Sequence, residues 1–123
     1  MSKKVLVAED SSVIQNLTKK ILEFQNYQLV SVKNGKEVLD TLQDEDFDVI
    51  LMDINMPVMD GMECSRKIRA LKDEKKANIP IIAITGNAPN YSMEDFRKAG
   101  IDHFLQKPLN FDELVDKVNE VTA

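Results

Sequence analysis

Four strand-like segments of this 123-residue chain each run into a polar side chain that could take part in phosphoryl chemistry. They are residues 5–8 before Glu9 and Asp10, 49–52 before Asp53, 81–84 before Thr85, and 103–106 before Lys107. If these segments are parallel strands of an open sheet, their ends lie along one edge, where such folds build ligand sites. Three carboxylates, a hydroxyl and an ammonium group would then converge, which indicates a metal-assisted phosphoryl acceptor.

The three carboxylates predict a cation site. Crowding Glu9, Asp10 and Asp53 raises at least one pKa unless a cation or hydrogen-bond donors offset the charge. Mg²⁺ takes oxygen ligands of this kind while retaining several waters. Lys107 adds a positive charge on a flexible stem that could meet a phosphoryl oxygen. An aspartate at a strand end is also a common turn former, so the combination, not any single residue, favours the site.

Strand and helix patterns alternate along the whole chain. Strands are predicted near 5–8, 27–32, 49–52, 81–84 and 103–106, and the first, third and fourth of these are continuous apolar runs. Helices are predicted between them, and Ser11 or Ser12, Ser92 and Asn110 are the expected caps. Short connections between alternating elements predict a parallel α/β sheet with helices on both faces.

Two helices carry distinctive apolar patterns. The first is expected to present residues that recur at helical spacing: Ile14, Leu17, Ile21 and Phe24, with Val13 and Leu22. The helix over 91–99 has a thin stripe of Met93, Phe96 and Ala99, so we expect it to be the least firmly packed. The charged run 72–76 is interpreted as a solvated helix end and loop.

Composition narrows the functional classes. The length predicts one domain over residues 1–123, and the net charge of -5 argues against nucleic acid or an anionic membrane as partner. A lone Cys64 predicts a plain buried or half-buried thiol, and a lone His103 argues against a histidine-based metal site or triad. Without a signal peptide or an apolar run long enough to span a bilayer, the sequence predicts a soluble, cytoplasmic protein.

These motifs resemble those of a known family. Glu9-Asp10, the stretch 52–61, Thr85-Gly86 and Lys107-Pro108 are similar to the receiver domains of two-component response regulators, and the resemblance extends over about residues 4–121. It implies the flavodoxin-like (βα)5 fold with strand order 2-1-3-4-5, which general descriptions of this fold illustrate with a member of the family.

The resemblance also implies a phosphorelay. Asp53 corresponds to the aspartate that accepts a phosphoryl group from the phosphohistidine of a sensor histidine kinase or a histidine phosphotransfer protein. Mg²⁺, with Mn²⁺ as a possible substitute, would be held by Asp10, Asp53 and the backbone carbonyl of Asn55, and by Glu9 through a water. The domain would be a regulatory phosphoacceptor rather than an enzyme, assisting its own phosphorylation and dephosphorylation.

Other positions would respond to the phosphoryl group. By resemblance, Thr85 and Lys107 bind its oxygens, and Phe104 occupies the place of a switch aromatic. Pro108 is a candidate for a cis peptide bond. A downstream protein target is expected on the helix 91–99, strand five and the last helix.

Some residues depart from the commonest family pattern. Glu9 replaces the first aspartate of the acidic pair, and Phe104 stands where tyrosine is frequent. Asn55 and Asn87 occupy positions that tune the lifetime of the acyl phosphate.

Three other readings compete with the receiver. A haloacid-dehalogenase-type phosphatase needs a second aspartate where Asn55 stands, and a flavodoxin would not place Glu9-Asp10 beside a flavin phosphate. The remaining alternative is a pseudo-receiver, a protein-interaction module that works without phosphorylation. We expect a stand-alone receiver or a receiver within a larger hybrid kinase, either a monomer or a weak phosphorylation-dependent dimer.

Overall fold

A five-stranded, fully parallel sheet forms the centre of the molecule. The computed structural model describes residues 3–86 and 92–123, and its sheet has the order β2-β1-β3-β4-β5. The strands are β1 Lys4–Ala8, β2 Gln28–Val32, β3 Val49–Asp53, β4 Ile81–Thr85 and β5 His103–Gln106. The predicted parallel α/β class, strand order and approximate strand positions are therefore confirmed.

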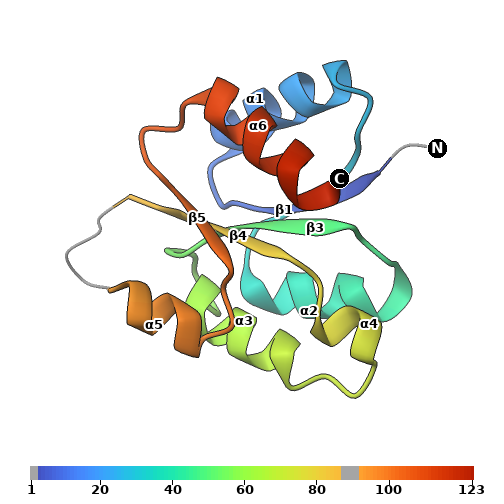
Figure 1. The fold of residues 1–123 in the computed structure, drawn as a ribbon, viewed down its shortest axis with the longest axis vertical. Coiled ribbons are helices and arrows are strands. Elements are labelled where there is room, and N and C mark those ends of the chain that lie inside the picture. Colours follow the sequence, from blue (N-terminus) through green and yellow to red (C-terminus); the bar gives the residue numbers. More distant parts are fainter. Residues whose placement is uncertain (1–2, 87–91) are drawn as a thin grey trace.

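Helices cover both faces of this sheet (Figure 1). The described residues form α1 Ser12–Phe24, α2 Gly35–Asp44, α3 Gly61–Arg69, α4 Glu74–Ala77, α5 Met93–Lys98 and α6 Phe111–Thr122. Helices α1 and α6 lie on one face, and α2, α3, α4 and α5 lie on the other. Both faces of the central strands are therefore shielded from water, as continuous apolar runs require.

Local sequence determines where the helices start and stop. The side chains of Ser11, Ser92 and Asn110 accept hydrogen bonds from backbone N–H groups in the first turns of α1, α5 and α6, as expected. Ser92 and Asp95 complete a reciprocal capping box. Gly100 follows α5 with φ of +84°, a left-handed conformation that costs glycine little.

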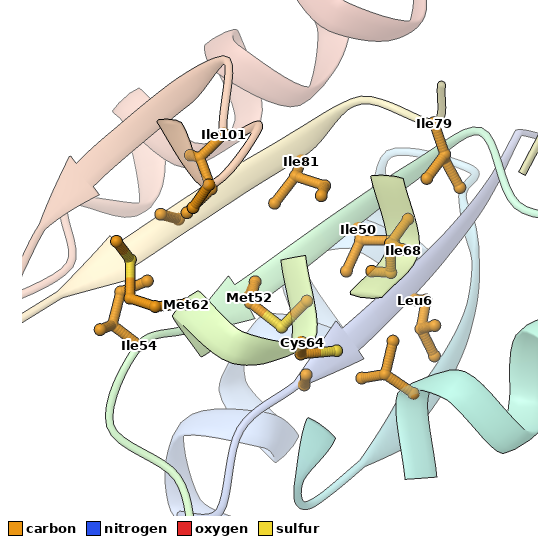
Figure 2. Packing of buried hydrophobic residues seen from close by; sticks show 14 of the residues in the cluster. Leu6, Ile50, Met52, Ile54, Met62, Cys64, Ile68, Ile79, Ile81 and Ile101 are labelled. Carbon is orange, nitrogen blue, oxygen red and sulfur yellow. The ribbon is translucent and has the colours of Figure 1, made fainter. Parts of the chain in front are cut away.

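The core divides into two apolar layers, one on each side of the sheet. All five residues of β3 and all five of β4 are buried. Figure 2 shows the layer beneath α3, where Met52, Cys64 and Ile68 pack together. The predicted buried thiol is confirmed, since Cys64 has no solvent exposure and burial raises its pKa to about 12. The helices thus pack on the sheet through apolar contacts, and this packing holds the polar edge of the sheet in place.

The apolar residues of α1 recur at helical spacing as predicted, but they are not all buried. Leu22 and Thr18 are buried and Ile14 and Ile21 are half-buried, but Val13, Leu17 and Phe24 are 69%, 45% and 85% exposed. The apolar arc of this helix is wider than the strip that touches the sheet. Only one edge of that arc is therefore buried, and a threonine fills part of the contact.

Two other expectations need adjustment. A short helix, α4, forms within the charged run that was read as a helix end and loop, because Asp73 caps it by accepting from the N–H groups of Lys75 and Lys76.

In α5, Phe96 is buried, as is Ala99 just after the helix, but Met93 is 61% exposed, so the predicted stripe is only partly in the core. Tyr91, the predicted start of that helix, lies outside the described residues.

Arg69, the last residue of α3, ties together three segments at the end of the sheet opposite the acidic residues. Its guanidinium donates to the carbonyl oxygens of Gly100, Ala77 and Ile79 at 2.7–2.8 Å. It also pairs with Asp102 at 3.1 Å. These bonds satisfy main-chain acceptors at the end of α4, the start of β4 and the turn into β5.

We predict that Arg69→Met lowers the free energy of unfolding by about 3 kcal/mol, because methionine retains the stem but leaves these carbonyl groups without their donor. Arg66→Met is the matched control, since Arg66 lies on the same helix and is exposed. Chemical denaturation of both variants checks this. Equal stabilities would contradict the structural role of Arg69.

Candidate functional site

The three predicted carboxylates meet at one edge of the sheet. Ala8 of β1 pairs in register with Met52 of β3, so the residues that follow these positions emerge side by side. Oxygen atoms of Glu9, Asp10 and Asp53 lie within 4.8 Å of one another. Glu9 and Asp53 are only 2% and 1% exposed, whereas Asp10 is exposed to solvent.

Lys107 brings a positive charge to this cluster from the end of β5. Its Nζ lies 3.2 Å from Asp53 Oδ2 and 3.7 Å from Glu9 Oε1. Its backbone N–H donates to the carbonyl of Thr85 at 2.8 Å, and the Lys107–Pro108 peptide bond is cis. The stem of Lys107 runs beside Gly86, where an added Cβ would lie 3.4 Å from the lysine Cδ.

Backbone N–H groups hold the two buried carboxylates. Ser11 N donates to Glu9 Oε2 and Asn55 N donates to Asp53 Oδ1, each at 3.2 Å. Asp53 therefore has one oxygen bonded to a main-chain amide and the other to Lys107. Across the described part of the chain, Glu9 Oε1 is the buried side-chain oxygen without a hydrogen-bond partner. The cluster thus contains a buried carboxylate oxygen that accepts no hydrogen bond.

The environment of Glu9 disfavours its charge. Burial raises the pKa of Glu9 to about 7, and the nearby Asp53 carboxylate adds to the effect, because it repels the ionised form of Glu9 and can accept a hydrogen bond only from the protonated form. The Ser11 N–H and the Lys107 charge act in the opposite direction without cancelling it. A second cation in the cluster would favour ionised Glu9.

The donor set fits a magnesium ion. Three carboxylates, one of them solvent-exposed, supply the oxygen ligands that hard divalent cations prefer. The unpartnered oxygen of Glu9 and its raised pKa both indicate missing positive charge at this position. The acidic cluster therefore suits Mg²⁺.

The other predicted site residues do not all lie in the acidic cluster. Thr85 is 3% exposed at the end of β4, beside the main chain of Lys107. Phe104 is half-buried and stacks on Phe96, with ring centroids 5.9 Å apart. Phe104 thus contacts α5 rather than the acidic cluster. Asn87, predicted to tune the acyl phosphate, lies outside the described residues.

Sequence reasoning missed residues that position the cluster without carrying charge. Gly61 begins α3, and a Cβ there would lie 2.5 Å from the Asp53 carbonyl oxygen, so only glycine permits this approach. Gln15 binds the main chain of Glu9 through its side-chain amide. The sequence pattern gave no signal for Gln15, because its neighbours at helical spacing, Ser12, Thr18 and Lys19, are also polar.

Known proteins with similar sequences include receiver domains and sensor kinases. The family model of the response regulator receiver domain matches residues 5–119. A sensor kinase/phosphatase for the autoinducer CAI-1, CqsS of Vibrio cholerae, is 37% identical over 116 residues, covering 94% of this chain and 17% of that protein. The polar-differentiation response regulator DivK of Brucella ovis is 29% identical and is covered over 94% of its length by 96% of this chain.

A solved structure is also similar. The receiver domain of the sensor histidine kinase PA1611 of Pseudomonas aeruginosa, described with a magnesium ion coordinated in its active-site cleft, superposes with a TM-score of 0.89 at 31% identity. The alignment covers 99% of this chain and 98% of that one. By contrast, this chain spans only 7–17% of the three hybrid or sensor kinases that it matches first.

The fold and the acidic edge of the sheet define a phosphoacceptor module with a CheY-like architecture. The chain belongs to the family of response regulator receiver domains of two-component systems. Among the described helices, none has the length and apolar character needed to cross a bilayer.

The raised pKa of Glu9 predicts a pH dependence of stability. The unfolded value is 4.5 and the folded value about 7, so folding favours the protonated carboxyl. This contribution is fully present below pH 4.5 and is lost as the pH rises to about 7. Glutamine mimics the protonated form and does not titrate. The stability of Glu9→Gln relative to wild type should therefore rise across this window, by on the order of 2–3 kcal/mol.

Thermal unfolding in a metal chelator at several pH values measures this difference. Comparing the variant with wild type removes the contribution of the other carboxylates. A pH-independent difference would show that folding does not shift the pKa of Glu9.

Proposed function

We propose that Asp53 is the residue that accepts the phosphoryl group. The observation that carries this assignment is its placement: a buried carboxylate at the end of a central strand, bonded by Lys107 and a backbone amide, beside two further carboxylates. A carboxylate oxygen held in this way is oriented for attack on phosphorus. Asp10 is exposed, and Glu9 accepts only the Ser11 N–H among the described residues, so neither carboxylate is oriented through both oxygens as Asp53 is.

The transfer is a displacement at phosphorus. An oxygen of Asp53 forms a bond to the phosphorus as the bond from phosphorus to the histidine nitrogen breaks, and the electron pair stays on the imidazole. Lys107 then exchanges its contact with Asp53 for one with a phosphoryl oxygen, and the Thr85 hydroxyl donates to another. Both groups reach the site along neighbouring strand ends.

Asp10, Asp53, the Asn55 carbonyl and Glu9 through a water would hold Mg²⁺, or Mn²⁺ in its place. The ion supplies charge neutralisation for the phosphoryl oxygens when it is bound. The protein orients the carboxylate oxygens, because Ser11 N donates to Glu9 and Asn55 N donates to Asp53.

With Mg²⁺ and a small phosphodonor such as acetyl phosphate, the protein should gain one phosphoryl group, and Asp53→Asn should abolish this labelling because an amide cannot form the acyl phosphate. Intact-protein mass spectrometry gives the readout. Asp116→Asn, at an exposed aspartate on α6, is the matched control and should label normally. Full labelling of Asp53→Asn would overturn the assignment.

We further propose that α5, β5 and α6 form the surface read by a downstream protein. Beside the Phe96–Phe104 stack lies a cavity of about 310 Å³ lined by side chains of α5 and β5, including Met93 and His103. Phe104 pairs in register with buried Ala83, two residues before Thr85. A pull on Thr85 by a phosphoryl group would change the space available to Phe104 and so alter this surface.

This switch predicts a spatial pattern of amide NMR shifts. Beryllofluoride with Mg²⁺ mimics the phosphoryl group, and shifts should extend from Asp53 through Thr85 and Phe104 into α5, because packed neighbours must move together. Thr85→Ala should confine them to the acidic cluster, whereas Thr41→Ala on α2 should not. Shifts confined to the cluster in the wild type would refute the switch.

The histidine-bearing donor is a kinase or phosphotransfer protein, consistent with the family. A role without phosphorylation is not favoured, because the chain retains the aspartates, the threonine and the lysine in one site. The relatives include both architectures: this chain covers 17% of a sensor kinase and 94% of a response regulator.

A further inference from the structure

Gln15, on the first turn of α1, makes a double contact with the main chain beside the acidic cluster. Its side-chain Nε2 donates to the carbonyl oxygen of Glu9 at 2.6 Å and to that of Val32 at 2.7 Å. A primary amide carries two N–H donors, and both are used here. Because both partners are carbonyl oxygens, the orientation of the amide is determined by chemistry: only the NH₂ end can face them.

These two carbonyls lie where the sheet ends. The ladder between β1 and β2 stops at the pair Ala8 and Val32. Beyond it, Glu9 N donates to Val32 O at 3.0 Å, and Gln15 binds Glu9 O. The amide of Gln15 therefore continues the ladder by one residue. Both main-chain polar groups of Glu9 are held relative to β2, the N–H by the Val32 carbonyl and the carbonyl through Gln15.

The side chain of Glu9 has little other support. One oxygen accepts from Ser11 N at 3.2 Å. The other has no hydrogen-bond partner among the residues described and lies 3.7 Å from Lys107 Nζ. The neighbouring Asp10 is exposed. The positions of these two carboxylates thus depend mainly on the main chain that carries them, which is the main chain that Gln15 holds.

We propose that Gln15 is a positioning residue that presets the main chain of Glu9 and Asp10 for binding the divalent cation. This inference rests on the proposed function and concerns the regulation of the same site by a residue that touches neither the cation nor the phosphoryl group. Without the amide, the loop after β1 has more conformations open to it, and cation binding must select among them. The affinity for the cation falls, while the chemistry at Asp53 is unchanged once the cation is bound.

The test compares Gln15→Met with wild type. Methionine has a similar length and shape but offers no donor to either carbonyl. Titrating Mg²⁺ and following the amide signals of Glu9 and Asp10 by NMR should give a dissociation constant about tenfold higher than in wild type, at the lower end of the range for residues supporting metal ligands. Phosphorylation by acetyl phosphate should be slower at limiting Mg²⁺ and normal at saturating Mg²⁺.

Two further variants complete the experiment. Gln25→Met, at an exposed glutamine just after α1, is the matched control and should bind Mg²⁺ as wild type does. Gln15→Asn keeps the amide but is too short to reach both carbonyls, so an intermediate affinity is expected. It also provides the measurement if Gln15→Met does not fold.

The outcomes separate the two proposals. If wild type takes up phosphate but Gln15→Met, or Gln15→Asn in its place, binds Mg²⁺ with wild-type affinity, Gln15 only anchors the helix and this inference is wrong. A rate that stays low at saturating Mg²⁺ would overturn it as well. If wild type itself shows no Mg²⁺-dependent phosphorylation, the proposed function fails first.

Discussion

The structure depends on one electrostatic constraint: two carboxylates, Glu9 and Asp53, lie almost out of reach of water and share a single ammonium group, that of Lys107. Burial disfavours the charge on Glu9, and the pKa of Glu9 rises to about 7 although the charge of Lys107 acts in the opposite direction. An edge of the sheet with this excess of negative charge is poised to take up a divalent cation and, with it, a phosphoryl group.

Much of the fold holds that edge in place. Parallel pairing brings the ends of β1 and β3 together, and the close approach of α3 at Gly61 fixes the main chain of Asp53. At the opposite end of the sheet, Arg69 joins α3 to the start of β4 and the turn into β5. The apolar layers thus act as a rigid base, on which main-chain amides, Lys107 and Gln15 hold the polar groups at the edge.

Prediction from sequence succeeded where a property is local. Continuous apolar runs identified the three central strands, and serine and asparagine caps identified the starts of α1, α5 and α6. Sequence was not sufficient where a property depends on which segments pack against each other. In α1 the apolar arc is wider than its contact with the sheet, so Phe24 is exposed and Thr18 is buried. The short helix α4 was missed because Asp73 acts as a cap within a run that reads simply as charged.

The sequence by itself determined which residue types stand at the strand ends, and hence that carboxylates, a threonine and a lysine would share one edge of a parallel sheet. Only the tertiary structure decided which carboxylates are buried, which oxygen of Glu9 lacks a partner, and that Gln15 bridges β1 and β2. The reason is physical. Strand and cap preferences are set by neighbours along the chain, whereas desolvation and hydrogen-bond satisfaction are set by segments that meet only after folding.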